Sequence, residues 1–340
     1  MSRVIVAGMG AVSPAGWGAA PLCEAADARA VLPTQGLERP GAEEIAVRGV
    51  PAASREILSR FRHPRLRRVS AISRYGVVAA LEALEDAAGL IDPASDRIGV
   101  VFCSTCGCVA YSRRFYHEAL EDPQLASPML FPETVFNAPS SHLSALLENA
   151  AENYTMVGDS GSVAQGVAMA AQWLLRGSLD ACLVVAAEEC DWLVADAFRH
   201  FSDAVPTAEG AGALALTLSD AEAPALVGIT DPHQYSWTLP RAAAVRRMRD
   251  QLPACESDTE SLLSGGATGA SRGDRAESEA WSDWRGRRID PQTVTGHGFA
   301  AGAMWQMVTA VNALRAGAAR RSLVSLPGAY QFAIGAEFSI

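Results

Sequence analysis

The spacing of apolar residues changes between a helical and a strand-like pattern along the chain. Apolar residues recur at helical spacing from Val163 to Leu175, and Gly177 stands where a helix stop is expected. A continuous apolar run follows from Ala181 to Ala187, and a run this short suits a strand that is covered on both faces. Residues 156–189 are therefore predicted to form a tight turn, a helix and a buried strand.

The same patterns predict the elements on either side. Strands are expected to begin at Arg3 and to lie at 97–103 and 208–218, and helices at 70–88, 191–201 and 299–317. A second set of elements opens at 225–230, and a mostly apolar stretch at 332–340 closes the chain. A glycine-rich turn followed by an alanine-rich helix occurs at 158–175 and again at 296–314. This recurrence predicts an internal duplication.

Ser160 stands at the turn before the first of these two helices. Gly158 and Gly161 flank it, and glycine permits the positive φ angles and close backbone approach that a sharp strand-to-helix turn needs. At a helix N-terminus, free N–H groups and the helix dipole favour a developing negative charge, which suits a nucleophile. A serine that only caps the helix would stand in the same place. Both interpretations remain open at this point.

Composition limits the kind of protein. The 340 residues are 49% hydrophobic, no apolar run is long enough to span a membrane, and the first residues lack the features of a signal peptide. We therefore expect a soluble, cytoplasmic protein without a membrane partner. The net charge of −10 argues against a nucleic-acid surface. A local basic patch could dock a small partner or could be a solvated helix start; it consists of Arg60, Arg62, Arg65, Arg67 and Arg68.

Seven cysteines at uneven spacing do not resemble a secreted disulfide framework. Cys103, Cys106 and Cys108 lie close together in the sequence, but no second cluster of Cys or His completes a tetrahedral metal site. We expect these three to be small buried residues, and we expect no bound metal.

Five segments in order carry a family resemblance. They are the opening strand and turn at 3–16, the Ser160 turn, EGAGAL at 209–214, GATGASRGDRAE at 266–277 and GHGFAAG at 296–302. Together they resemble the β-ketoacyl synthase family, which has the thiolase fold. The resemblance implies an α/β protein with two βαβ-rich halves, 1–220 and 221–340, in a five-layer α/β/α/β/α sandwich. It also implies a dimer through the strand at Ala181–Ala187.

The catalytic set of that family is largely absent. By this alignment Ser160 replaces the nucleophilic cysteine, Gly266 replaces the first catalytic histidine and Gln292 replaces a lysine. Only His297 is kept, and the terminal glycine-rich turn has become LPGAYQF around Gly328. A serine hydroxyl needs an adjacent base to attack, whereas a thiol is readily ionised. Self-sufficient condensation is therefore not expected.

The leading hypothesis is a non-condensing homologue that resembles the chain-length-factor subunits of type II polyketide or polyene synthases. The resemblance implies a partner ketosynthase that carries the cysteine, or a second copy of the chain, and an acyl carrier protein that brings the phosphopantetheine, with no cofactor of its own. Ser160 is then a helix cap and His297 a hydrogen-bonded remnant. The residues expected to line the tunnel are Phe131, Phe136, His142, Gly266, Phe299 and Gly328.

Two enzymatic alternatives remain. In the first, Ser160 is a nucleophile and His297 its general base, in an acyltransferase or hydrolase that acts on carrier-protein or coenzyme A thioesters. In the second, GDSGS approximates an α/β-hydrolase nucleophile elbow, and Asp274 or Asp290 completes a triad with His297. The second leaves the opening turn and EGAGAL unexplained.

Overall fold

A computed structural model describes residues 2–60, 62–124, 126–148, 150–200, 205–236, 238–252 and 260–340. Its strands are β1 (Arg3–Ser13), β2 (Gly16–Trp17), β3 (Gln35–Leu37), β4 (Ile45–Arg48), β5 (Ile98–Ser104), β6 (Ala150–Val157), β7 (Ala181–Glu188), β8 (Thr207–Ala208), β9 (Gly210–Ser219), β10 (Ala225–Ile229), β11 (His233–Gln234), β12 (Ser261–Ser264), β13 (Arg287–Ile289), β14 (Arg321–Leu326) and β15 (Phe332–Ser339).

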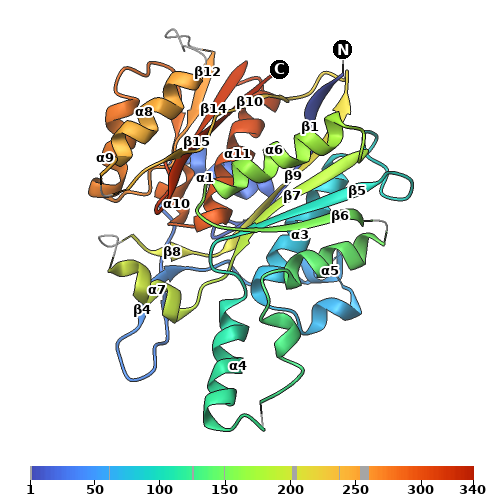
Figure 1. The fold of residues 1–340 in the computed structure, drawn as a ribbon, viewed down its shortest axis with the longest axis vertical. Coiled ribbons are helices and arrows are strands. Elements are labelled where there is room, and N and C mark those ends of the chain that lie inside the picture. The colour runs from blue at the N-terminus through green and yellow to red at the C-terminus, as the bar shows by residue number, and fades with distance from the viewer. Residues whose placement is uncertain are drawn as a thin grey trace.

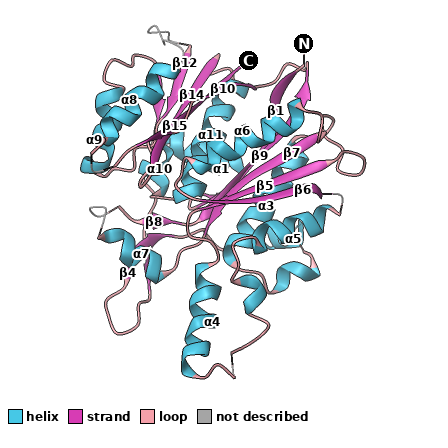
Figure 2. Ribbon diagram, viewed as in Figure 1, coloured by secondary structure: helices cyan, strands magenta, loops and turns pink. Residues whose placement is uncertain are grey.

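The helices surround these strands (Figures 1 and 2). They are α1 (Ala19–Ala28), α2 (Arg55–Arg60), α3 (Ala71–Asp86), α4 (Val109–Glu121), α5 (Ala138–Leu147), α6 (Ser162–Leu175), α7 (Trp192–Arg199), α8 (Arg241–Gln251), α9 (Ser271–Ala280), α10 (Pro291–Thr295) and α11 (Phe299–Arg315), with 3-10 turns η1 (Pro64–Arg67) and η2 (Phe131–Glu133).

One long sheet runs through both predicted halves, in the order β13-β12-β14-β15-β10-β1-β9-β7-β5-β6. The two halves join where β1 pairs with β10 through a single residue pair, Ile5 with Ala225. A second, small sheet has the order β3-β4-β8. The division into 1–220 and 221–340 stays a prediction, because the sheet is continuous across it.

Successive residues of one strand face different helical layers, because side chains alternate across a sheet. Leu262 of β12 belongs to a core with α6 and α11, whereas the next residue, Leu263, packs with α8. Val184 of β7 also faces the α6 and α11 layer, and its neighbour Val185 faces α3 and α5. Three helical layers therefore alternate with two parts of the sheet. The predicted α/β/α/β/α sandwich is confirmed.

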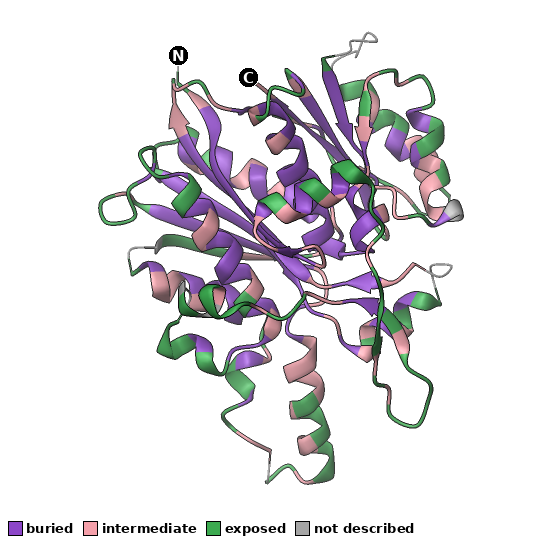
Figure 3. Cartoon of the chain, turned by 180° about the vertical axis from the view of Figure 1, so that it is seen from behind, coloured by how far each residue is buried: buried purple, intermediate pink, exposed green. Residues whose placement is uncertain are grey.

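The middle layer explains the composition of α11. Nearly every residue of this helix is buried, from Phe299 to Leu314, because sheet packs on both of its sides. Figure 3 shows the same burial along the strands that flank it. A helix that is apolar all round is typical of such a position.

The predicted dimer strand is wrong. β7 is hydrogen-bonded to β5 on one side and to β9 on the other, so it has no free edge to offer a partner. The outermost strand at this end of the sheet is β6, which pairs only with β5 among the strands of the described residues. Its side chains are mostly exposed or half-buried, including Tyr154 and Val157.

Two further features bear on function. α4 has no buried residue and projects away from the body of the molecule (Figure 1). The helix predicted at 191–201 ends at Arg199 as α7, and residue 201 lies outside the described residues. No helix in the described part of the chain is long and apolar enough to cross a membrane.

Candidate functional site

A cavity of about 530 Å³ lies where the two halves meet. The turn after β6, the loop after β12, the turn after β14 and the residues before α11 all contribute to it. It is lined by Ser160, Phe198, His200, Arg241, Gly266, Thr268, Ala270, Gly273, Asp274, Gln292, His297, Gln306, Pro327, Gly328, Ala329 and Tyr330. Four of the predicted site residues, Ser160, Gly266, His297 and Gly328, therefore share one cavity.

Ser160 does not cap the helix that follows it. The N-cap of α6 is Gly161, which has no side chain to cap the first turn. The Ser160 hydroxyl instead donates to Asp159 Oδ1 over 3.4 Å, a long hydrogen bond. The interpretation of Ser160 as a capping serine is wrong.

The buried carboxylate of Asp159 accepts hydrogen bonds from two separate turns of the chain. Its carboxylate is 3% exposed and accepts the N–H of Ser160 at 2.8 Å. It also accepts the N–H groups of Ala329, Tyr330 and Gln331 at 2.9–3.0 Å. One buried carboxylate thus joins the Ser160 turn to the terminal turn.

The two glycines beside Ser160 have different roles from those predicted. Neither Gly158 nor Gly161 has a positive φ. A Cβ at Gly161 would lie 2.5 Å from the Phe332 ring and 2.9 Å from Ile334, both on β15, whereas a Cβ at Gly158 would meet nothing closer than 3.5 Å. Gly161 is therefore required for close packing between the two halves, and not for its backbone angle.

His297 is buried between aromatic rings at the start of α11. Its ring stacks on Phe198 at 4.5 Å and 5°, and contacts Phe299 edge-on at 4.5 Å. The residue is 8% exposed, and neither ring nitrogen has a hydrogen-bond partner among the described residues. Burial lowers the pKa of His297 from 6.5 to about 4, although the nearby Asp159 opposes this. The imidazole is therefore neutral at physiological pH, and the predicted hydrogen-bonded remnant is wrong.

Gly266 stands where the family places a histidine, and the structure leaves no room for one. A Cβ at this position would lie 2.5 Å and 3.0 Å from the Pro327 ring carbons and 3.1 Å from the Ser325 carbonyl oxygen. Pro327 of the terminal turn lies where the side chain of a residue at this position would begin. Replacement of Gly266 by histidine alone would require Pro327 to move.

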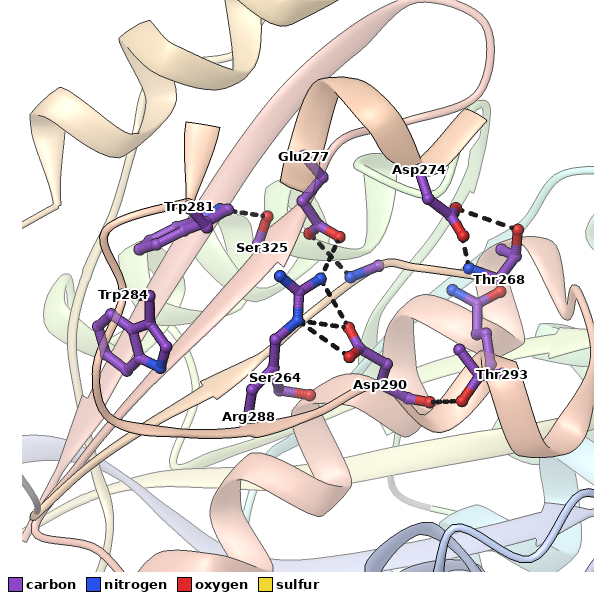
Figure 4. A network of polar contacts seen from close by, with 12 residues as sticks. Ser264, Thr268, Asp274, Glu277, Trp281, Trp284, Arg288, Asp290, Thr293 and Ser325 are labelled. Atoms are coloured by element: carbon purple, nitrogen blue, oxygen red, sulfur yellow. Dashed lines mark hydrogen bonds and ion pairs between the residues drawn. The ribbon is translucent and has the colours of Figure 1, made fainter. Parts of the chain in front are cut away.

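Buried acids hold the Gly266 loop (Figure 4). Glu277 accepts the Gly266 N–H at 2.9 Å and pairs with Arg288, which also pairs with Asp290. Burial raises the pKa of Glu277, and Arg288 opposes the shift. The GD-x-x-E part of the motif is thus a support for the loop.

The proposed hydrolase triad is wrong. Asp274 accepts the N–H groups of Thr268 and Gly269 at 3.0 and 2.8 Å. Asp290 pairs with Arg288, and the nitrogens of His297 have no partner in the described part of the chain. Neither aspartate therefore orients the histidine.

Gln292, in the place of the family lysine, belongs to a neutral pair. Its Nε2 donates to Gln306 Oε1 at 3.2 Å, and its Oε1 accepts the Gly298 N–H. Gln306 in turn donates to the carbonyl oxygens of Ser264 and Ser325. The cavity wall therefore carries no charge at this point.

The remaining predicted tunnel residues do not line the cavity. Phe131 and Phe136 lie in the segment that follows α4, outside the cavity lining, and they are 55% and 45% exposed. His142 on α5 hydrogen-bonds to Glu133 at 2.7 Å. Phe299 packs behind His297 without reaching the cavity surface.

The sequence profile of the beta-ketoacyl synthase N-terminal domain matches residues 55–281, which is more than half of the chain. The chain belongs to the β-ketoacyl synthase family. A comparison with curated proteins finds no match.

Solved structures share the fold of this β-ketoacyl synthase family member over its whole length. The ishigamide ketosynthase/chain length factor has a TM-score of 0.83 at 18% identity and covers 99% of both chains. A β-ketoacyl synthase from Burkholderia phymatum has a TM-score of 0.80 at 17% identity, covering 100% of this chain and 99% of its own. A ketosynthase in complex with its chain length factor from Xenorhabdus doucetiae has a TM-score of 0.76 at 13% identity, covering 100% of this chain and 98% of its own.

Two parts of the cavity were not predicted from sequence. Arg241, the first residue of α8, lies outside the motifs of the resemblance, and Tyr330 lies in the LPGAYQF turn, of which only Gly328 was predicted to be a site residue. Only the fold brings them to the same cavity as Ser160 and His297.

Proposed function

We propose that the chain is a non-condensing, chain-length-factor-like subunit that pairs with a cysteine-carrying ketosynthase in type II polyketide or polyene biosynthesis. The observation that carries the proposal is the Asp159 carboxylate, bound to the amides of Ser160 and of the terminal turn.

In a condensing enzyme, amides at these two turns would stabilise the negatively charged oxygen of the thioester. The oxygen of a thioester becomes negative during attack, and preorganised N–H donors stabilise it. Here a buried carboxylate already accepts from those donors, so it would repel the developing charge. Pro327 fills the place of one catalytic histidine, which removes a second source of stabilisation. The loss of one such donor costs about a hundredfold to a thousandfold in rate.

An unpaired sheet edge and exposed apolar residues support a partner subunit. β6 is hydrogen-bonded on one side only, and exposed sheet edges tend to pair with another chain. Large apolar side chains are exposed on β6 and on the projecting segment from α4 to η2 and beyond; they are Tyr116, Leu120, Met129, Phe131, Phe136, Tyr154 and Val157. Apolar side chains that are exposed beside an unpaired sheet edge suit a surface that another chain covers.

A basic groove offers a place for an acidic carrier protein. Its floor includes Trp17 and Leu66, and its rim carries Arg62, Arg67 and Arg74. None of these arginines forms an ion pair with a described residue. The side chain of Arg60, predicted as part of the same basic patch, lies outside the described residues.

Co-expression with a cysteine-carrying ketosynthase tests the partner role. We expect a 1:1 complex by native mass spectrometry, weakened at least tenfold by Tyr154→Asp on β6. Val227→Asp is the matched control, because Val227 is 55% exposed on β10, away from the free edge. A stable homodimer that binds no such ketosynthase would contradict the proposal.

A Ser160 acyltransferase is the second candidate, because Ser160 and His297 line the same cavity. Intact-protein mass spectrometry after incubation with acyl-loaded carrier protein separates the two candidates. The partner role predicts no added mass on the wild type or on Ser160→Ala. An acyl adduct that appears on the wild type and is absent from Ser160→Ala would favour the acyltransferase.

A further inference from the structure

α4 projects from the body of the molecule, and polar contacts near its start attach it there (Figure 1). The helix has no buried residue. Two acidic side chains that follow β7 bind it: Glu189 accepts the Ala110 N–H at 2.9 Å, and Asp191 pairs with Arg113 at 2.9 Å. The attachment of α4 therefore includes two acids from one short segment.

The second of these acids also begins α7. Asp191 is the N-cap of α7, and its carboxylate accepts the Leu193 N–H at 3.0 Å. Arg113 Nε donates to both oxygens of the same carboxylate, at 3.1 and 2.9 Å. The Arg113 guanidinium also lies 5.7 Å from the centroid of the Trp192 ring, at the first residue of α7. One buried carboxylate therefore joins α4 to the start of α7.

The far end of α7 covers the cavity. Ala195 and Phe198 are the buried residues of this helix. The Phe198 ring lines the cavity and stacks on His297 at 4.5 Å and 5°. His297 is 8% exposed, and its nitrogens have no hydrogen bond to a described residue. Phe198 is therefore the part of α7 that shields the imidazole.

The charges at this junction favour the ion pair. Burial raises the pKa of Glu189 to about 7, and the nearby carboxylates of Glu209 and Asp191 raise it further. Arg113 is the cation that pairs with Asp191 in the described part of the chain. Removal of Arg113 would leave the Asp191 carboxylate buried, without a counter-charge and close to other acids.

We propose that the ion pair between Arg113 and Asp191 couples α4 to α7, so that the position of α4 controls access to His297 in the cavity. Arg113 is a positioning residue, because it acts on Phe198 through Asp191 and does not line the cavity itself. The coupling is a property of the single chain. A protein that covers the exposed side of α4 would use it to act on the cavity; this consequence rests on the proposed partner role, whereas the coupling does not.

Carbethoxylation by diethyl pyrocarbonate, followed by peptide mass spectrometry, measures access to His297 in the isolated full chain. The reagent attacks neutral imidazole, the main form of histidine at about pH 7.5. Arg113→Gln should raise the rate of His297 modification about tenfold, because the open fraction of α7 rises by the factor that one hydrogen bond to a charged group represents. His233, on β11 in the other half, is the internal reference and should react at an unchanged rate.

Three further variants test the pair itself. Arg114→Gln is the matched control: it removes the same charge from the next residue of α4, whose side chain is 65% exposed and pairs with Glu118, and it should change the rate less than about twofold. Asp191→Asn keeps an N-cap acceptor for the Leu193 N–H but removes the ion pair, so it should act like Arg113→Gln. The double variant should react no faster than the faster single variant, because both substitutions break the same pair.

A Phe198→Ala variant tests the route to the cavity. It should expose His297 directly, and Arg113→Gln added to it should then change the rate less than about twofold. The proposal is overturned if folded Arg113→Gln and Asp191→Asn both keep the wild-type rate, or if Arg114→Gln raises the rate as much as Arg113→Gln does. A parallel rise at His233 would also overturn it, because the whole chain would then have loosened. None of these outcomes requires a ketosynthase, so failure of the partner role would leave the test intact.

Discussion

At the scale of single residues, Asp159 determines what the Ser160 turn can do. The carboxylate next to Ser160 accepts the N–H groups of Ser160 and Tyr330, so these two amides already have a charged partner. Asp159 is also structural, because it joins residues 160 and 329–331 across the two halves. The chemistry and the stability of this site are therefore linked through one side chain.

Asp159→Ala tests the structural part of this role. The substitution leaves four backbone N–H groups without their charged acceptor, and each hydrogen bond to a charged group contributes about 1.5–3 kcal/mol. Because water from the cavity can replace part of this, we expect the free energy of unfolding to fall by about 3 kcal/mol in urea denaturation. Ser160→Ala is the control, since it removes one 3.4 Å hydrogen bond and should cost less than about 1 kcal/mol. Equal stability of the two variants would mean that Asp159 does not hold the turns together.

At the scale of elements, the contact between α6 and β15 joins the Ser160 turn to the second half. It depends on Gly161, whose missing side chain admits Phe332 and Ile334. We expect Gly161→Ala to lower the free energy of unfolding by about 1–3 kcal/mol, as overpacked cores do. Gly158→Ala, where a Cβ has ordinary contacts only, should change it by less than about 1 kcal/mol. Thermal unfolding of both variants measures the difference, and a stable Gly161→Ala would show that β15 can shift without cost.

These glycines illustrate how far the sequence predicts the elements. Periodicity located the helix at 163–175 and the strand at 181–187 to within a residue or two, because burial sets the spacing of apolar residues along each element. The role predicted for Gly161 is wrong, and so is the dimer through Ala181–Ala187 that the family resemblance implied, because β7 is paired on both sides. Close approaches and strand order are contacts between distant segments, which local spacing does not encode. Arg241 is a further example: the fold brings it to the cavity from a distant segment that contains no motif.

At the scale of the whole molecule, buried carboxyl groups link stability to pH. Glu188 ends β7 and accepts the N–H groups of Thr105 and Cys106 after β5. Burial raises the pKa of Glu188 from 4.5 to about 7, and those hydrogen bonds only partly oppose it. Burial raises the pKa of the adjacent Glu189 to about 7 as well. Both groups are therefore more easily protonated in the folded chain than in the unfolded chain.

The sign of the effect follows from this difference. Between about pH 4.5 and pH 7 the folded state binds more protons than the unfolded state, so each group stabilises the fold fully below pH 4.5 and loses this contribution as the pH rises through 7. For Glu188 the loss is about 3 kcal/mol. Glutamine resembles the protonated form, so Glu188→Gln should match the stability of the wild type near pH 4 and exceed it near pH 8, in urea denaturation at both pH values. The stability contribution of His297 has the opposite pH dependence below pH 6.5, but His297 is present in both proteins, so its effect cancels in the comparison.

Glu24→Gln is the control, because Glu24 lies on the exposed side of α1. Its free energy of unfolding should differ from that of the wild type by the same amount at every pH. If the stability of Glu188→Gln also differs from that of the wild type by the same amount at every pH, the Glu188 carboxylate is already ionised in the folded protein. Its charge must then be stabilised by the Thr105 and Cys106 amides.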